Sequence, residues 1–260
     1  MVTQPAIEFY PSQENVSTIP LPRIFIVLVS RIVSFLLFQL AVAGALLLAG
    51  AADPLNQSVA WWPYSAAFGS IVSYILMISA MRKENKSILS FYKFNKPTIL
   101  IDILTVLGAF VALGPLTFFP NIWLGNLLFG DSALTMDMMF PPFSPALAII
   151  GAIIFPLTVG MSEIPVYYGY TLPRLKGRMG LAGALILSVT VHALQHSALP
   201  FIPDWRFIAW RFGMFLPLAL AMGVLLYSRP RLMPYIVICH ILMDLSAGYL
   251  IYHAAVKVLM

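Results

Sequence analysis

Apolar runs, each long enough to cross a bilayer, alternate with short polar segments along this chain. A helix needs about 20 apolar residues to span the hydrocarbon layer, and an open backbone cannot satisfy its polar groups in lipid. The pattern therefore predicts an all-α polytopic bundle with seven transmembrane helices. The predicted spans are Ile24–Gly50, Ala60–Ala80, Pro97–Phe119, Pro145–Tyr170, Met179–Phe201, Phe207–Ser228 and Leu232–Leu259.

The composition also indicates a membrane protein. Of the 260 residues, 60% are hydrophobic and 10% are charged, and the mean hydropathy is +0.90. Soluble domains carry about 25% charged residues, so we expect residues 24–260 to form a single transmembrane domain. Residues 1–23 are expected to form a short polar arm that stays attached, because Glu8 and Glu14 lie where a cleaved signal peptide would be basic. The single cysteine, Cys239, has no partner for a disulfide or a CxxC site.

Lysine and arginine gather in alternate loops. The loops after the second, fourth and sixth runs are basic, whereas residues 51–59 and 120–144 contain neither residue type. By the positive-inside rule, the N-terminus is cytoplasmic and the C-terminus lies on the far side of the cell (inner) membrane. Because the net charge of +5 lies mainly in these loops, it indicates orientation; the expected partner is membrane lipid, not nucleic acid.

One segment, Asn121–Pro142, is too polar for a clear span and too apolar for an ordinary loop. An interfacial or re-entrant helix suits Trp123 and the methionine and phenylalanine residues of this segment. The alternative is an eighth span, which would invert every later loop and break the charge pattern. We therefore expect seven spans.

A carboxylate, Glu163, stands inside the apolar run that begins at Pro145. A charge at that depth is costly and normally faces a partner or a water-filled cavity, so it marks a candidate functional site. Three other ionisable residues, Arg31, Asp102 and Arg211, lie nearer the ends of their runs. Snorkelling of these side chains to the interface explains them, and we assign them no role.

Two further spans each carry two ionisable residues four positions apart. His192 and His196 form the sequence VHALQH, and His240 and Asp244 form CHILMD. Residues at that spacing share one helix face, so either pair alone is explained by a polar contact that holds helices together. Three helices that each bring acid or imidazole groups into the membrane favour a common site.

Such a site has the groups for hydrolysis. A carboxylate beside an imidazole can deprotonate water, and a second imidazole can donate to a developing oxyanion. The alternative is a divalent metal such as zinc, held by Glu163, His196, His240 and Asp244, because imidazoles and a carboxylate are the donors of catalytic zinc. The spacing gives zinc little support, since Ala193 stands where an HExxH motif has glutamate.

In chain order, these three stretches resemble the motifs of the CPBP family of intramembrane proteases, also called the CAAX-protease, bacteriocin-processing or Abi family. The family motifs are Glu-Glu-x-x-x-Arg-Gly running into a short basic loop, then Phe-x-x-x-His, then His-x-x-x-Asn or Asp. The corresponding stretches here are EIPVYYG (163–169), HALQH (192–196) and HILMD (240–244). The resemblance covers about residues 145–260, and the earlier spans match only in being hydrophobic.

The resemblance implies roles for four residues. Glu163 matches the catalytic glutamate, and His196 matches the imidazole that helps it to activate water. His240 and Asp244 match the pair that holds the oxyanion. An ionised Asp244 would repel an oxyanion, so it is expected to be protonated, to act through His240 or to bind a metal.

Three positions depart from the family motifs. Ile164 replaces the second glutamate, Tyr168 replaces the arginine, and His192 replaces the phenylalanine. The loss of a glutamate and an arginine together leaves no buried unpaired charge if the two normally pair. Tyr168 and His192 are therefore additional candidate site residues. A count of about 1.5 Å per residue from the basic loops places His196 far from Glu163, which makes His192 the alternative partner.

We therefore expect an intramembrane endopeptidase that cleaves a peptide or membrane-protein substrate with a water activated by Glu163 and His196. The main alternative is a chain that keeps the scaffold without catalysis and serves as an accessory or assembly subunit of a membrane complex. A proton- or metal-coupled carrier is a third alternative. It requires an aqueous path to both faces, and the sequence shows no internal repeat.

Overall fold

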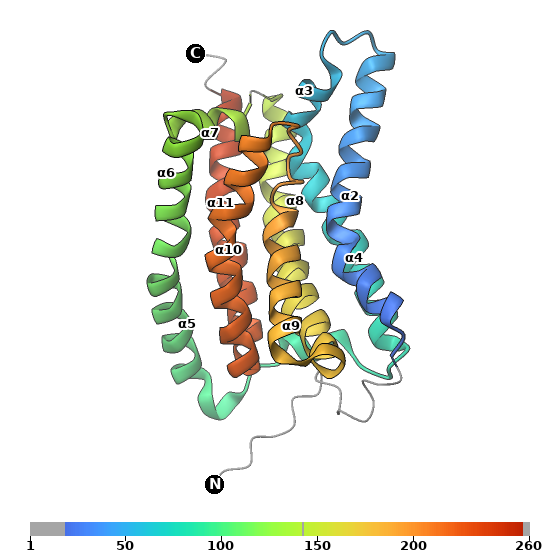
Figure 1. The fold of residues 1–260 in the computed structure, drawn as a ribbon, viewed down its shortest axis with the longest axis vertical. Helices are drawn as coiled ribbons and strands as arrows, with labels where there is room; N and C mark the ends of the chain where they lie inside the picture. Colours follow the sequence, from blue (N-terminus) through green and yellow to red (C-terminus); the bar gives the residue numbers. More distant parts are fainter. Residues whose placement is uncertain (1–18, 142, 257–260) are drawn as a thin grey trace.

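A computed structural model describes residues 19–141 and 143–256, and these residues form a bundle of helices that run along the long axis of the molecule (Figure 1). The described part is all-helical and contains no named strand, which confirms the helical class that the sequence predicted. Most of the expected N-terminal polar arm, Pro142 and the end of the last predicted span lie outside the described residues.

The helices begin and end as follows. They are α2 Leu21–Leu48, α3 Pro54–Ser58, η1 Val59–Trp61, α4 Trp62–Arg82, η2 Ile88–Tyr92, η3 Lys96–Thr98, α5 Ile99–Leu113, α6 Pro115–Phe129, α7 Ala133–Met139, α8 Pro145–Ile164, η4 Pro165–Thr171, α9 Leu172–Gln195, α10 Trp205–Ser228, η5 Pro230–Leu232 and α11 Met233–Val256.

Six helical segments in the described residues are long and apolar enough to cross a membrane. The longest, Pro145–Gln195, joins α8, η4 and α9. Within α9, Gly180 has φ 75° and ψ 172°, a conformation that a residue with a Cβ rarely adopts. The helix bonding therefore breaks at Gly180, and α9 consists of two helices that meet there.

The ambiguous segment 121–142 is divided between two helices. Its first part continues α6 to Phe129, so the third apolar run extends beyond the predicted end at Phe119. Gly130, with φ 79°, ends α6 in the left-handed conformation that commonly stops a helix. The short helix α7 follows, and α5 and α6 together form one column at the side of the bundle (Figure 1).

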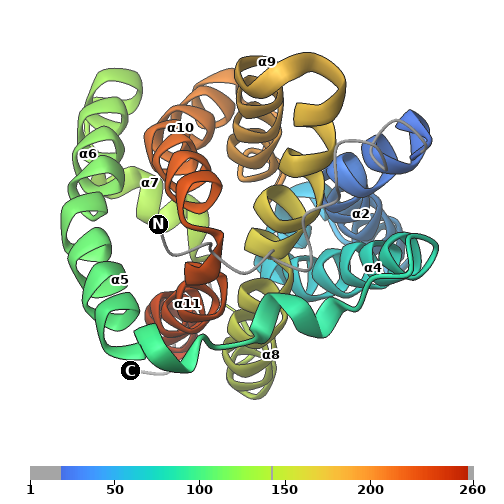
Figure 2. The same cartoon turned by 90° about the horizontal axis from the view of Figure 1, so that it is seen from below.

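Helices α8 and α11 form the most extensive helix pair in the bundle (Figure 2). Small residues allow their backbones to approach closely, as is common in membranes. A Cβ on Gly160 would lie 2.3 Å from Ile241 Cγ1, and a Cβ on Gly248 would lie 2.8 Å from the Ala152 carbonyl oxygen. This contact fixes Glu163, one turn after Gly160, against the face of α11 that carries His240.

Two of the expected surface charges are instead buried. Asp102 is fully buried on α5, and its Oδ1 lies 2.9 Å from Arg231 Nε, so snorkelling was the wrong explanation for this residue. The expected basic loop after the fourth span is helical, and its Arg174 is fully buried. Arg174 Nε donates to Glu84 Oε2 over 3.0 Å, which neutralises this cation inside the protein.

Candidate functional site

Glu163 lies at the junction between α8 and a π-helical segment, η4. Pro165 has no backbone N–H, so the regular α-helical bonding is interrupted one residue after Ile164. Single π-turns inside helices are rare and often occur at functional sites. All seven residues of η4 are buried, including Tyr167 and Tyr168, so the segment is part of the core around Glu163.

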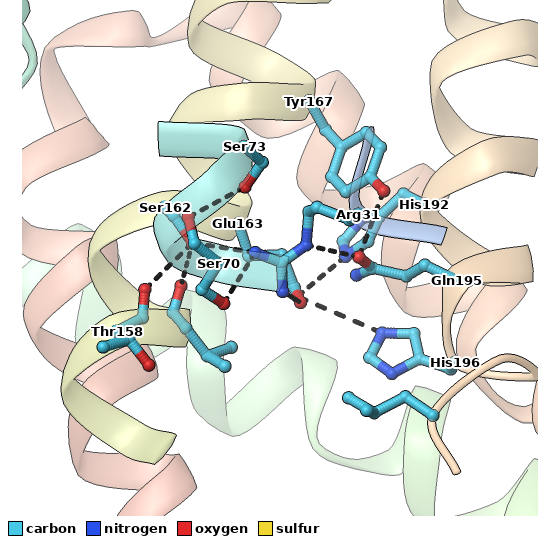
Figure 3. A network of polar contacts seen from close by, with 12 residues as sticks. Arg31, Ser70, Ser73, Thr158, Ser162, Glu163, Tyr167, His192, Gln195 and His196 are labelled. Atoms are coloured by element: carbon cyan, nitrogen blue, oxygen red, sulfur yellow. Dashed lines mark hydrogen bonds and ion pairs between the residues drawn. The ribbon is translucent and has the colours of Figure 1, made fainter. Parts of the chain in front are cut away.

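The two oxygens of the Glu163 carboxylate have different partners (Figure 3). Oε2 accepts a hydrogen bond from Arg31 Nη2 over 3.0 Å, and Oε1 lies 3.0 Å from His192 Nε2. Glu163 is only 4% exposed. A buried carboxylate is tolerated when it is paired and hydrogen-bonded, and here a guanidinium supplies the balancing charge.

Arg31 is the largest departure from the sequence-based prediction, because it does not snorkel. The side chain is fully buried and reaches from α2 into the centre of the bundle. Its four hydrogen bonds join α4, α8 and α9 (Figure 3). They run from Nε to Gln195 Oε1 (2.6 Å), from Nη1 to Ser70 Oγ (3.0 Å) and Ser162 Oγ (2.7 Å), and from Nη2 to Glu163 Oε2 (3.0 Å).

His192 is held on every side. The Tyr168 hydroxyl donates to the Ala219 carbonyl over 2.6 Å, and its oxygen lies 2.6 Å from His192 Nδ1. The ring stacks on Tyr167 with the centroids 4.8 Å apart and an angle of 17°. Tyr168 thus orients His192, and His192 in turn orients Glu163.

His196 also reaches Glu163, with Nε2 4.0 Å from Oε1. The depth count had placed the two residues far apart because it ended the fourth helix near Arg174. The chain remains helical as far as Gly180, which follows Glu163 by 17 residues and precedes His196 by 16. At about 1.5 Å per residue the two arms are nearly equal in length, so His196 returns to the level of Glu163.

The end of α9 is fixed by two residues from other helices. Arg211 Nε donates to the His196 carbonyl over 3.1 Å and Nη2 donates to the Leu199 carbonyl over 3.2 Å; Arg211 is 8% exposed, so it does not snorkel either. Gln39 binds both the N–H and the carbonyl of Phe201 over 2.7 Å. The His196 ring is therefore held at a defined end of its helix, where it also stacks on an aromatic ring of α10.

His240 completes the cluster from α11. Its Nε2 lies 3.7 Å from Glu163 Oε1 and 3.5 Å from Asp244 Oδ2. Among the described residues, His240 Nδ1 and Asp244 Oδ2 are buried atoms that have no hydrogen-bond partner. Buried polar atoms of this kind are normally satisfied by water or by a ligand, which indicates that the side of the site near α11 accepts one.

A cavity of about 200 Å³ lies against this cluster. Its polar lining comes from Glu163, His192, His196, His240, Asp244, Arg211 and Asn121. The remaining lining is apolar and comes from α4, α5, α7, α8, α10 and α11, together with Phe140 and Leu199. Arg31 and Tyr168 do not line the cavity. The structure thus brings together every predicted site residue, and Tyr168 contacts the cluster through His192 Nδ1.

The donors also have the chemistry of a metal site. The ligand atoms of Glu163, His192 and His196 lie within 4.8 Å of one another, so the compact set contains His192 where the sequence indicated His240 and Asp244. Two imidazoles and a carboxylate fit zinc, which when bound would supply a water that loses its proton near neutral pH. The Glu163 carboxylate already has a counter-ion in Arg31, however, and does not require a metal to balance its charge.

The sequence did contain a signal for Arg31. It lies ten residues after the first residue of α2, about 15 Å along the helix, which is deeper than a side chain needs to snorkel. Gln195 carried no comparable signal, because uncharged polar residues are common in membrane helices.

Comparison with protein-family models, with curated proteins and with solved structures finds no match for this chain.

Proposed function

We propose that this chain is an intramembrane endopeptidase that hydrolyses a peptide bond with a water activated by Glu163. The observation that carries the proposal is the convergence of three imidazoles on a single carboxylate oxygen. His192, His240 and His196 place their Nε2 atoms 3.0, 3.7 and 4.0 Å from Glu163 Oε1, beside a largely apolar cavity. Ionisable groups clustered within a membrane bundle are typical of functional sites.

The two carboxylate oxygens of Glu163 have different roles. Arg31, which does not line the cavity, donates a hydrogen bond to Oε2, so Oε1 is the oxygen that can act as a general base. His192 is already hydrogen-bonded to Oε1. His196 and His240 lie beyond direct hydrogen-bond reach of Oε1 but within reach of one bridging water.

The reaction then follows general acid–base chemistry. A water held by His196 loses one proton to Glu163 Oε1 as its oxygen bonds to the carbonyl carbon of the substrate. His240 donates from Nε2 to the resulting oxyanion. Glu163 returns the proton to the amide nitrogen, the C–N bond breaks, and an amine and a carboxylic acid leave. Asp244, with Oδ2 3.5 Å from His240 Nε2, acts through that imidazole by holding the ring in position.

The resemblance to the CPBP family supports this assignment through the order and spacing of its motifs. The departures at Ile164 and Tyr168 have physical counterparts in the structure. Tyr168 binds His192 in place of an arginine, and Arg31 brings a guanidinium to Glu163 from a different helix. A charge-balanced carboxylate is therefore retained without the second glutamate.

The break at Gly180 supports seven passes, because it divides the long segment Pro145–Gln195 into two arms. We propose that the N-terminus is cytoplasmic, since the basic positions before α5 and around Arg229 then lie on the cytoplasmic side of the cell inner membrane.

A non-catalytic scaffold subunit of a membrane complex is the second candidate. The replacement by Ile164 favours it, because this apolar side chain lines the cavity where the family motif has a carboxylate. The two candidates make opposite predictions for activity.

The test uses the purified chain in phosphatidylcholine vesicles with a panel of single-span peptides, and cleavage is followed by mass spectrometry. We expect cleavage that Glu163→Gln abolishes, whereas Asp137→Asn, an exposed acidic residue outside the cavity, leaves it unchanged. A chelator should also leave it unchanged, because Arg31 already balances the charge of Glu163. Equal cleavage by Glu163→Gln would exclude this carboxylate as the base, and no cleavage of any peptide would favour the scaffold.

A further inference from the structure

Helices α5 and α6 together form the least buried wall of the site cavity. Only Asp102 and Val106 are buried among its 15 residues, and only Gly125 is buried in α6. In the most apolar stretch of Ile88–Phe129, 11% of the residues are buried inside the protein, against 33–50% in the other five segments. Few packed side chains therefore oppose a movement of α5 relative to the bundle.

A second cavity, of about 290 Å³, lies between α5 and α11. Its lining is apolar apart from the hydroxyl of Tyr235 and the thiol of Cys239. The residues that line it are Phe94, Ile99, Ile103, Val106, Leu107, Tyr235, Ile238 and Cys239. We call this cavity the α5–α11 groove. The Asp102–Arg231 ion pair joins the first turn of α5 to η5, the short helix that precedes α11.

The α5–α11 groove and the site cavity lie along the same helix faces. On α5, Ile103, Val106 and Phe110 recur at helical spacing; the first two line the groove and Phe110 lines the site cavity. On α11, Cys239 lines the groove and Met243, one turn later, lines the site cavity. The two spaces therefore lie one after the other along α5 and α11, and the second contains Asp244 and Glu163.

We propose that movement of α5 joins these two spaces into one entry path for the substrate, and that its occupant is an apolar transmembrane segment of a polypeptide that enters sideways from the lipid. The proposal rests on the proposed function for the cleavage that follows entry, and it defines the substrate class as a polypeptide already in the membrane.

A polypeptide suits the path better than a lipid acyl chain does. The inner end contains two buried polar atoms that form no hydrogen bond, His240 Nδ1 and Asp244 Oδ2; the only polar contact of the latter is the 3.5 Å approach of His240 Nε2. An acyl chain placed there has no donor or acceptor for these atoms and would leave them unpaired in hydrocarbon. The carbonyl and N–H groups of an unwound peptide segment would satisfy them, while its apolar side chains occupy the α5–α11 groove.

Because Cys239 is the single cysteine, it gives a direct test of occupancy. A bimane fluorophore is attached to Cys239, and the protein is reconstituted in phosphatidylcholine vesicles with a leucine–alanine single-span peptide that carries one tryptophan. We expect the peptide to quench the bimane in a saturable manner. The control places the bimane on Leu104→Cys in a Cys239→Ala background, since Leu104 is 60% exposed and does not line the groove. It should show only quenching that rises linearly with peptide.

Equal and unsaturable quenching at the two positions would overturn the proposal. Saturable quenching of the Cys239 bimane by brominated phosphatidylcholine that the peptide does not relieve would also overturn it, because a lipid would then be the occupant. The measurement uses the Glu163→Gln variant as well as the native chain. It therefore remains decisive even if no peptide is cleaved and the proposed function fails.

A reversible cross-link between α5 and α11 tests whether cleavage requires entry by this path. Leu107→Cys or Ile103→Cys, each paired with native Cys239 across the α5–α11 groove, is joined with a short bifunctional maleimide or by oxidation. We expect the oxidised form to lose cleavage of a single-span peptide and to recover it on reduction, whereas Leu104→Cys does not cross-link to Cys239. Undiminished cleavage by fully cross-linked protein would show that substrate enters elsewhere.

Discussion

Replacement of Arg31 with methionine removes a buried cation that four hydrogen bonds hold against Gln195, Ser70, Ser162 and Glu163. Two contributions to the free energy of unfolding are lost. Polar side-chain contacts between membrane helices contribute about 0.6 kcal/mol each on average. Removal of one partner of a buried ion pair costs about 3–5 kcal/mol, because the other charge is stranded. The stranded Glu163 carboxylate therefore dominates, and we expect a loss of about 3–5 kcal/mol.

A double-mutant cycle isolates this contribution. If the cost of Arg31→Met comes mainly from the unpaired carboxylate, Glu163→Gln should relieve it, and the double variant should be more stable than Arg31→Met alone. We expect a coupling free energy at the upper end of the usual range, about 2–3 kcal/mol. The assay is reversible unfolding in mixed detergent micelles with increasing dodecyl sulfate, followed by circular dichroism.

Arg211 provides the matched control. It is buried like Arg31, but its guanidinium donates to backbone carbonyls instead of a carboxylate. Arg211→Met should be destabilising as well, and Glu163→Gln should not relieve that loss. If Arg31→Met and Glu163→Gln are additive within about 0.5 kcal/mol, the ion pair does not stabilise the site as described.

Three further predictions concern the supports of the site. Tyr168→Phe removes the hydroxyl beside His192 Nδ1, and we expect kcat to fall about tenfold, which corresponds to about 1.4 kcal/mol of activation free energy. KM should stay unchanged because Tyr168 does not line the cavity. A change in KM alone would contradict this role. Gly160→Val forces a Cβ against the backbone of α11 and should cost about 1–3 kcal/mol of stability, whereas Gly44→Val, which meets nothing within 4 Å, should cost less in a parallel unfolding measurement. Hydrogen bonds from Arg206 lower the pKa of Asp204, the N-cap of α10. The ionised Asp204 cap contributes about 1 kcal/mol to the free energy of unfolding. This contribution is present above the pKa that Asp204 has in the unfolded chain and is lost as the pH falls through its pKa in the folded protein. Asp204→Asn should therefore abolish this loss of stability at acid pH, as measured by unfolding at neutral and acid pH.

The sequence predicted the helical class and the members of the cluster because both depend on local patterns. Apolar runs mark helices, and His192 with His196, or His240 with Asp244, share a face by spacing alone. It did not predict which imidazole bonds to Glu163, because that depends on where a helix turns. Gly180, not the basic residues before it, sets that turn.

The partners of Arg31 and Asp102 were also beyond the sequence. The depth of Arg31 indicated an internal partner, but only the positions of α4, α8 and α9 around α2 decide which groups bind it. Asp102 is paired by Arg231, more than 100 positions away in the chain. Neither contact leaves a trace in local composition.

The reversal at Gly180 has a consequence for how much change this chain tolerates. The helical arms that join Gly180 to Glu163 and to His196 differ in length by one residue. The two site residues therefore lie at the same level only because the arms on either side of Gly180 are nearly equal in length. A one-residue insertion in either arm would displace its site residue by about 1.5 Å and rotate it by about 100° around the helix. Insertions and deletions between residues 163 and 196 should therefore be far more damaging than substitutions there, and lengthened variants should be tolerated only in the connections outside this interval.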